Sequence, residues 1–290
     1  MRTTLKELYG LFKVRIGFAI ALSAMAGVAV TPGLSLPVWQ IVVLGLTALG
    51  ASAAAGAFNQ LVEVDLDARM ARTRRRPFVT GRYKAGLAWH LGILLLLAGS
   101  VTVAGLMLNP LVGFYLFLGA VFYGVIYTVW LKRRTPWNIV IGGLSGTFAV
   151  LAGSAAVAPV PGPVPMILAM VLFLWTPPHF WSLAAALEKD YATAGVPMLP
   201  VVLGMRRGAR VIFAHTLVLV IISLLPGLFG YGPVYMIPAA LGGGYFLYRN
   251  WIFVRDPRPV TAMRTFFASL AQLILVLAGA MLEGGFIAGL

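Results

Sequence analysis

The chain contains no cysteine, and acidic side chains are scarce, with 8 Asp and Glu among 290 residues. The absence of cysteine excludes disulfides, thiolate metal sites and cysteine nucleophiles. Charged residues of both signs make up 10% of the chain, whereas soluble domains usually carry about 25%. Hydrophobic residues make up 60%. This composition is typical of an integral membrane protein.

Long stretches without charge predict the membrane-spanning helices. They cover 16–62, 85–131, 135–187, 211–248 and 265–282. A helix needs about 20 apolar residues to cross a bilayer, so most of these stretches hold two helices, divided by turn formers such as Asn109-Pro110. The sequence predicts a single domain over 1–290 with nine transmembrane helices, at 14–31, 37–60, 86–108, 110–131, 137–158, 164–187, 209–229, 233–249 and 265–286.

The basic residues predict how these helices cross the membrane. All 22 Lys and Arg lie beside one set of the breaks between helices, and the alternate breaks carry none. Because positive charge marks cytoplasmic loops, we expect a cytoplasmic N-terminus and a C-terminus on the outer side. The formal charge of +14 thus indicates orientation in a lipid bilayer, and no nucleic-acid partner is expected.

A first polar cluster ends the second predicted helix. Asn59, Glu63 and Asp67 are spaced by four residues, which on one continuous helix places them in one stripe. Such oxygen ligands suit Mg2+, which takes one or two carboxylates plus substrate phosphates. Arginines follow at positions 69, 72, 74, 75 and 76. Since guanidinium groups bind phosphate, the run predicts a magnesium-diphosphate site. Alternatively, it is an ordinary cytoplasmic loop with local ion pairs.

A second basic patch and a second polar cluster follow. Lys132, Arg133 and Arg134 close the fourth predicted helix, and Asn138 beyond them either binds substrate or caps the next helix. The segment WTPPHFW (175–181) lies inside a predicted span, where we expect its two prolines to break the helical ladder against protein or a cavity.

The second polar cluster continues toward the next loop. On one continuing helix, His179 and Asp190 would share a face about 16 Å apart. His179 is either a site residue or a hydrogen-bonded packing residue. The apolar loop 191–200 is expected to be a lid, or else to pack against lipid headgroups.

Five segments resemble one family of intramembrane aromatic prenyltransferases, the heme O synthases or protoheme IX farnesyltransferases. They are NQLVEVDLDARMART (59–73), RPFVTG (76–81), YTVWLKRRTPWNIVIGG (127–143), WTPPHFWSLA (175–184) and DYATAGVPMLPVV (190–202). The last two distinguish this family from quinone and chlorophyll prenyltransferases. Glu63 stands where the family usually has Asp, so the longer side chain is expected to set the metal deeper or to bind it through water.

The resemblance implies a reaction and an architecture. A farnesyl group passes from farnesyl diphosphate to a vinyl group of heme B, water is added, and heme O, the precursor of heme A, forms. The implied fold has nine transmembrane helices around a central cavity that opens toward the cytoplasmic side, in the inner membrane of a prokaryote. Association with heme A synthase or a terminal oxidase assembly is also implied.

The resemblance also implies roles for individual residues. It assigns Mg2+ to Asn59, Glu63 and Asp67, and the diphosphate to Arg72, Arg76, Lys132 and Arg133. His179 and Asp190 match the second motif and are candidate bases for the water, with heme ligation as an alternative for His179. Aromatic faces are expected to stabilise the farnesyl cation by about 1–2 kcal/mol each, with Tyr127, Trp175 and Trp181 among them.

Two other functions fit parts of the sequence. A prenyltransferase with a quinone-precursor acceptor shares the first motif but leaves the PPHFW segment unexplained. A secondary transporter also uses broken helices and a polar cavity, but it would place ionisable groups near the bilayer midplane. Here nearly all of them lie at one predicted face.

Overall fold

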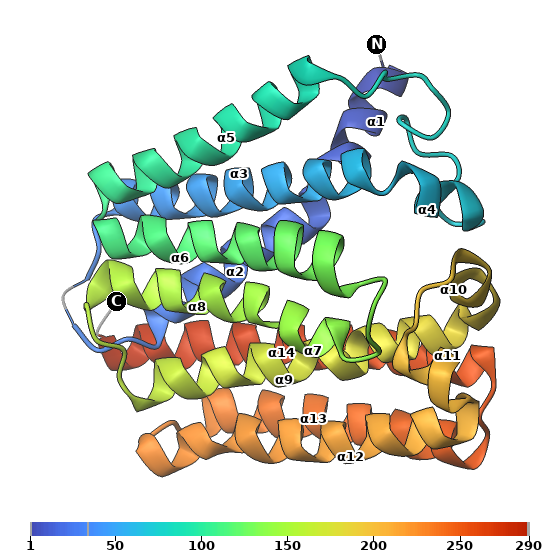
Figure 1. Ribbon diagram of the computed structural model, residues 1–290. Coiled ribbons are helices and arrows are strands. Elements are labelled where there is room, and N and C mark those ends of the chain that lie inside the picture. The colour runs from blue at the N-terminus through green and yellow to red at the C-terminus, as the bar shows by residue number, and fades with distance from the viewer. Residues whose placement is uncertain (1, 34, 289–290) are drawn as a thin grey trace.

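The computed structural model describes residues 2–33 and 35–288, and every regular element in these ranges is a helix (Figure 1). The predicted all-α class is therefore confirmed. In chain order the elements are α1 Arg2–Leu11, α2 Val14–Ala29, α3 Val38–Val62, α4 Val64–Arg69, α5 Leu87–Met107, α6 Pro110–Val121, the π-helix η1 Phe122–Leu131, α7 Asn138–Gly142, α8 Leu144–Val157, α9 Pro163–Ala186, α10 Glu188–Ala194, α11 Leu199–Leu203, α12 Met205–Leu224, the 3-10 helix η2 Leu225–Phe229, α13 Pro233–Arg255 and α14 Pro259–Ala288.

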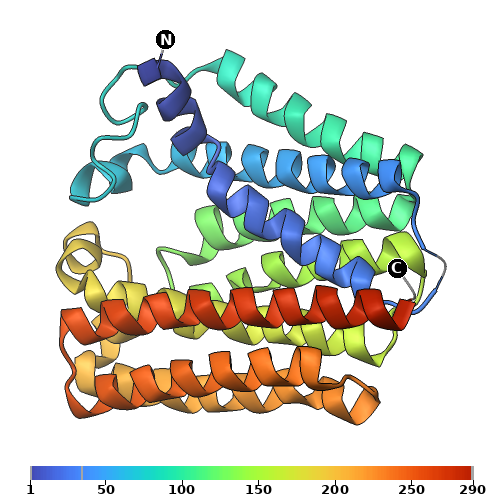
Figure 2. The same ribbon diagram turned by 180° about the vertical axis from the view of Figure 1, so that it is seen from behind.

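The long helices form one bundle, and four of the short helices lie at one of its ends. α1, α4, α10 and α11 lie together at this end, as Figures 1 and 2 show from opposite sides. We call it the basic end, because the arginine-rich loop after α4 and residues 132–134 after η1 also lie there. The opposite end holds the connections from α5 to α6, α8 to α9 and α12 to α13. The separation of charged and uncharged breaks in the sequence therefore corresponds to two ends of the bundle.

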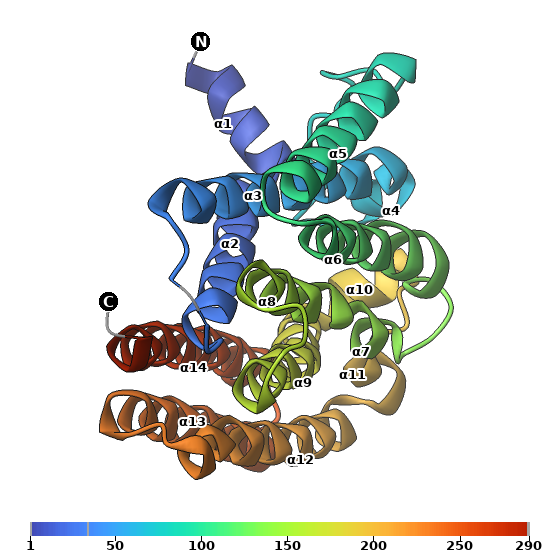
Figure 3. The same ribbon diagram turned by 90° about the vertical axis from the view of Figure 1, so that its left-hand side faces the viewer.

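Two central helices join the halves of the bundle. α2 packs against α3, α8 and α14, and α8 also contacts α6 and α9 (Figure 3). The crossing of α2 and α8 depends on glycine, because a Cβ on Gly27 would collide with the backbone of Val150, and a Cβ on Gly153 with that of Ala24. Small residues allow this close approach between helices in a membrane, where burial drives association weakly.

Fewer helices than the predicted nine are long and apolar enough to count as candidate membrane spans. Within the described residues, seven helices pass as candidate membrane spans, and the bent pair Thr4–Leu11 with Val14–Ala29 would make an eighth. The two parts of that pair meet at 47°. α13 is not among the seven, although it is 23 residues long. The count of nine spans therefore remains a prediction.

Two expected continuous helices are interrupted. α3 ends at Val62 and α4 begins at Val64, with Glu63 between them at φ −106° and ψ 21°. α9 ends at Ala186, and Leu187 takes φ −116° and ψ 33° before α10 begins. The expectation that His179 and Asp190 share one helix face is therefore wrong, because the chain changes direction between them.

The two prolines of α9, in contrast, do not end their helix. Pro177 and Pro178 lie inside α9, which continues to Ala186, so they interrupt its hydrogen-bond ladder without ending the helix. Each proline lacks the amide that would donate to the carbonyl four residues earlier, which is that of Phe173 for Pro177 and that of Leu174 for Pro178. The Ser182 hydroxyl donates to the Pro178 carbonyl at 2.6 Å.

A shared core fixes the helices of the basic end. It joins α4, η1, α9, α10, α11 and α12, and its members include Leu66, Trp181 and Tyr191. The loop between α10 and α11 belongs to it as well, because Val196 and Met198 are 1% and 0% exposed. Packing of these two side chains against lipid headgroups is therefore wrong, and the role of a lid stays a prediction.

Candidate active site at the basic end

Three polar side chains predicted as metal ligands are buried together at the basic end. Asn59 lies in the last turn of α3, Glu63 occupies the break, and Asp67 lies on α4; they are 3%, 1% and 2% exposed. The Asn59 amide donates to Glu63 Oε2 at 2.8 Å. We call these three the ligand cluster. The break at Glu63 keeps the cluster together although the helix is not continuous.

A buried carboxylate is costly unless it is paired, and each one in the ligand cluster has a cationic partner. Lys132 Nζ lies 2.6 Å from both carboxylate oxygens of Glu63. Arg76 Nη1 donates to Asp67 Oδ2 at 2.5 Å. Two of the four predicted diphosphate residues therefore reach the ligand cluster directly. The alternative of local ion pairs describes the contact of Arg76 with Asp67, nine residues apart, but not that of Lys132 with Glu63, 69 residues apart.

A third cation contacts the cluster, and sequence reasoning missed it. Lys13, in the break between α1 and α2, donates from Nζ to Asn59 Oδ1 at 2.5 Å and to the Tyr123 hydroxyl at 2.7 Å. In the sequence Lys13 is one of several basic residues before the first span and indicates only orientation. No local pattern distinguishes it, because its partners lie 46 and 110 residues away.

The π-helix η1 carries the aromatic wall of the site. Its wider turn brings Tyr123 and Tyr127 into a stacked pair with ring centroids 5.8 Å apart. Lys132 Nζ lies 5.7 Å from the Tyr127 ring centroid. Thr128 accepts from the Asn59 amide at 3.1 Å and donates to the Tyr123 carbonyl at 2.8 Å. π-Helical segments are frequent at functional sites, and this one carries three of the side chains beside the ligand cluster, with Lys132 directly after it.

Arg133 and Arg72 lie at the rim of the site. Arg133 forms a two-bonded pair with Asp65 at 2.7 and 2.8 Å, and both side chains are about half exposed, at 43% and 53%. Hydrogen bonds from Arg133 hold the pKa of Asp65 below its usual range. Burial raises the pKa of Tyr191, and the positive charge of Arg72 partly offsets this rise.

Asp190 approaches the first motif from the other half of the chain. Its Oδ2 accepts from the backbone amide of Arg72 at 3.4 Å, and α10 packs against α4. The two polar clusters of the sequence, 118 residues apart, thus meet at the basic end. Asp190 is brought to the arginine loop and not to His179.

His179 belongs to a separate aromatic cluster between α9 and α14. Its ring stacks on Trp175 at 4.1 Å and on Phe266 at 4.5 Å between centroids. Nδ1 is hydrogen-bonded to the Ser269 hydroxyl at 2.7 Å, and Trp175 Nε1 donates to the Ser269 carbonyl at 2.8 Å. Ser269 is a second residue that sequence reasoning missed. Trp175 and Phe266 stack on the His179 ring, so only the ring edge can contact a ligand.

Two further predicted residues lie buried with polar atoms unused. Asn138 is fully buried, and its amide donates to the Thr135 carbonyl at 2.6 Å, while Oδ1 has no partner among the described residues. Asn138 does not cap α7, because Trp137 occupies that position. Trp181 is 1% exposed with Nε1 unpaired in the described chain, and its ring meets those of Trp137 and His215 edge to face.

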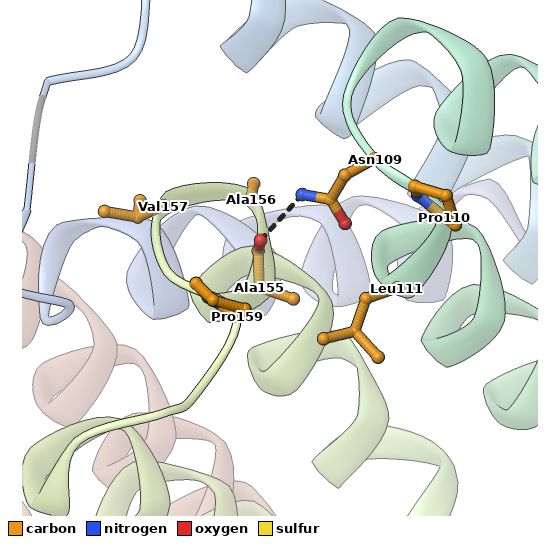
Figure 4. Close-up of a pocket in the computed structure, with 7 residues that line it drawn as sticks. All are labelled: Asn109, Pro110, Leu111, Ala155, Ala156, Val157 and Pro159. Carbon is orange, nitrogen blue, oxygen red and sulfur yellow. Dashed lines mark hydrogen bonds between the residues drawn. The ribbon is translucent and has the colours of Figure 1, made fainter.

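Two cavities lie at opposite ends of the bundle. One, of about 450 Å³, opens between α1 and the arginine loop, and it is lined by Lys6, Glu7, Gly10, Leu11, Gln60, Arg72, Arg75, Arg76 and Pro77. The other, of about 440 Å³, lies where α5 meets α6 and α8 ends, and its walls are mostly apolar (Figure 4). Its one polar side chain, Asn109, already donates to the Ala155 carbonyl at 2.8 Å. The cationic cavity is the one that adjoins the ligand cluster.

Comparison with known proteins places this arrangement in a family. The family model described as the UbiA prenyltransferase family matches residues 20–275. The chain belongs to the UbiA prenyltransferase family. A prenyltransferase was predicted from the motifs, and this prediction is confirmed.

Two protoheme IX farnesyltransferases are similar to this chain over nearly its whole length. The chain is 53% identical over 283 residues to protoheme IX farnesyltransferase 2 of Paramagnetospirillum magneticum, covering 98% of both chains. It is 40% identical to protoheme IX farnesyltransferase of Parvibaculum lavamentivorans, covering 96% of this chain and 88% of the relative.

Solved structures support the fold of this UbiA-family chain. A digeranylgeranylglyceryl phosphate synthase matches with a TM-score of 0.79 at 18% identity, over 99% of both chains. A UbiA homolog from Archaeoglobus fulgidus bound to DMAPP and Mg2+ matches with a TM-score of 0.68 at 16% identity, over 93% of this chain and 99% of that one.

The ligand cluster of this UbiA-family chain has the chemistry that Mg2+ requires. Two carboxylates and one carboxamide supply hard oxygen ligands, and Mg2+ takes one or two carboxylates with phosphate oxygens completing the shell. In the described part of the chain, no group of three or more His, Cys, Asp or Glu side chains is arranged to hold a metal unaided. The donor set thus fits a metal that arrives with a phosphate ligand.

Proposed function

We propose that this chain transfers the farnesyl group of farnesyl diphosphate to a vinyl group of heme B, with addition of water, and releases heme O and diphosphate. The observation that carries the proposal is identity of 40–53% over nearly the whole chain with protoheme IX farnesyltransferases. In this reaction the bond between C1 and the diphosphate oxygen breaks, the terminal vinyl carbon bonds to C1, water adds to the inner vinyl carbon, and one proton leaves.

The ligand cluster is the proposed binding place for the metal and the diphosphate. Asn59, Glu63 and Asp67 would hold Mg2+, which supplies positive charge to the leaving diphosphate. A UbiA homolog solved with DMAPP and Mg2+ supports this proposal. Lys132 and Arg76 bring positive charge to the same point. We assign them to the diphosphate oxygens, with Arg72 and Arg133 binding from the rim.

Aromatic side chains are proposed to hold the farnesyl chain and its developing cation. Tyr127 is next to Lys132, so its ring face lies beside the proposed diphosphate position. Trp175 and Trp181 lie on α9 and are buried, as is Asn138. We assign these three residues to the walls of the cavity that receives the apolar substrates. Each ring face that meets a cation contributes about 1–2 kcal/mol.

The proton of the added water requires a base. We assign this role to His179, because the Ser269 hydrogen bond at Nδ1 fixes the ring and directs the other nitrogen away from that partner. Asp190 hydrogen-bonds the arginine loop instead, so it is assigned to hold that loop beside the diphosphate.

The proposed setting is the inner membrane of a prokaryote. Nine spans, a cytoplasmic N-terminus, an outer C-terminus and a central cavity that opens to the cytoplasm are all part of this proposal, and the segregation of basic residues supports it. Heme O would then pass to an enzyme that oxidises it, such as heme A synthase, or to a terminal oxidase assembly.

One assay tests the reaction. Purified chain in detergent is incubated with heme B, farnesyl diphosphate and Mg2+, and the products are analysed for the mass of heme O. A quinone precursor such as 4-hydroxybenzoate replaces heme B in a parallel reaction. Heme O in the first reaction supports the proposal. Prenylated 4-hydroxybenzoate without heme O would favour the quinone alternative. If neither product formed, the transporter would be the function to test next.

A further inference from the structure

Lys13 has an unusual backbone conformation for a lysine. It lies between α1 and α2 at φ 47° and ψ 43°, and it is the one residue other than glycine with positive φ in the described chain. A left-handed non-glycine residue is strained and persists only where its surroundings hold it. The two helices that flank it meet at 47°. The chain thus bends at the point that directs the Lys13 side chain inward.

The end of that side chain is held by specific partners. Nζ donates to Asn59 Oδ1 at 2.5 Å and to the Tyr123 hydroxyl at 2.7 Å, and it lies 5.2 Å from the Tyr123 ring centroid. Gly56 makes room for it, because a Cβ at that position would lie 3.2–3.3 Å from three carbons of the Lys13 side chain. Lys13 is therefore a built part of the site.

Each member of the ligand cluster faces one cation. Lys13 contacts Asn59, Lys132 contacts Glu63 and Arg76 contacts Asp67. A divalent metal needs the same oxygens at about 2.0–2.1 Å. The ammonium on Asn59 carries the same sign of charge at nearly the same place, so metal and ammonium repel each other there. A diphosphate relieves this conflict, because its oxygens accept all three cationic groups.

We propose that Lys13 is a positioning residue that occupies the metal side of Asn59 until diphosphate arrives, so that divalent metal and diphosphate bind together and neither binds well alone. This inference rests on the proposed function. It adds a binding order, in which the cations move from the ligand cluster to the diphosphate as the metal enters. By linkage, diphosphate raises metal affinity by the same factor as metal raises diphosphate affinity.

The test measures binding without turnover. Full-length chain in detergent is titrated with Mn2+ alone by electron paramagnetic resonance, and with labelled pyrophosphate in the presence and absence of Mn2+. For the natural sequence we expect weak binding of Mn2+ alone and binding of pyrophosphate that Mn2+ strengthens about tenfold or more. Lys13→Met removes the competing charge, so it should bind Mn2+ alone about tenfold more tightly and bind pyrophosphate less tightly.

Two further variants keep the test decisive. Gly56→Ala keeps the charge and shifts the Lys13 side chain by only a few tenths of an ångström, so it should change the affinity for Mn2+ alone far less than Lys13→Met does. Lys84→Met removes an exposed lysine from the loop before α5 and should leave Mn2+ affinity unchanged. Monodisperse elution and a cooperative melt confirm that each variant is folded.

The outcomes separate this inference from the proposed function. If the natural sequence binds neither Mn2+ nor pyrophosphate, the metal-diphosphate site itself is wrong. If it binds both cooperatively but Lys13→Met binds Mn2+ alone no more tightly, the role of Lys13 is overturned and the proposed function stands. Tight binding of Mn2+ alone by the natural sequence would also overturn the inference.

Discussion

Substitution of Glu63 by glutamine removes one negative charge from the ligand cluster with little change in shape. The carboxylate is 1% exposed, and it accepts from Lys132 at 2.6 Å to each oxygen and from Asn59 at 2.8 Å. Glutamine retains one acceptor but leaves the Lys132 ammonium without its counterion. The substitution therefore tests the charge of the cluster rather than its packing.

The expected magnitude follows from the burial of the pair. Removing one partner of a fully buried ion pair costs about 3–5 kcal/mol. Lys132 is not fully buried, since its side chain is 12% exposed, so water compensates part of the loss. We expect a loss of about 1–3 kcal/mol in unfolding free energy, the range for a hydrogen bond to a charged group. Turnover should fall at least about 100-fold, as when one electrostatic contact to developing charge is lost.

Asp65→Asn provides the matched control. Asp65 lies two residues away, and its pair with Arg133 is about half exposed, so its loss should cost less than about 1 kcal/mol and leave turnover unchanged. Heme O formation is measured by mass and stability by thermal melting in detergent. If Glu63→Gln and Asp65→Asn turned over at equal rates, the carboxylate of Glu63 would have no part in the reaction and the reasoning from burial would be refuted.

Four other perturbations have defined outcomes. Chelation with EDTA should abolish heme O formation and added Mg2+ should restore it; activity indifferent to EDTA would contradict the metal assignment. Ser269→Ala frees the His179 ring, so kcat should fall about tenfold while KM for farnesyl diphosphate stays constant. Glu283→Ala removes two hydrogen bonds to backbone amides at the start of α13, which should cost about 1 kcal/mol in a thermal melt without loss of turnover. Arg133 lowers the pKa of Asp65 in the folded chain. The pair therefore stabilises the fold above the usual carboxyl pKa of about 3.9, and this stabilisation is lost as the pH falls through the lower pKa of the folded state. Thermal melts at pH 6 and pH 3 should show this loss in the natural sequence and not in Asp65→Asn.

The role of Glu283 is visible only in the structure. Its two oxygens accept from the amides of Gly232 and Tyr235 at 3.0 and 2.9 Å, across 51 and 48 residues. An acidic group at a helix start offsets the unpaired amides there. The single acidic residue of α14 therefore ties α14 to α13.

Local sequence determined the helices and the content of the ligand cluster. Predicted ranges such as 164–187 and 86–108 agree with α9 and α5 to within one residue at each end, because a long uncharged run and its turn formers are properties of neighbouring residues. The spacing of Asn59, Glu63 and Asp67 likewise indicated their proximity, since residues four apart stay close even when the helix bends at Glu63.

Only the tertiary structure decided which charges meet. The contacts of Lys132 with Glu63 and of Lys13 with Tyr123 join residues 69 and 110 positions apart, and they depend on which helices are neighbours. Periodicity cannot rank the 22 basic residues of the sequence, because each satisfies the same orientation rule. The packing of α2 and η1 around α3 selects the few that reach the buried oxygens of the candidate site.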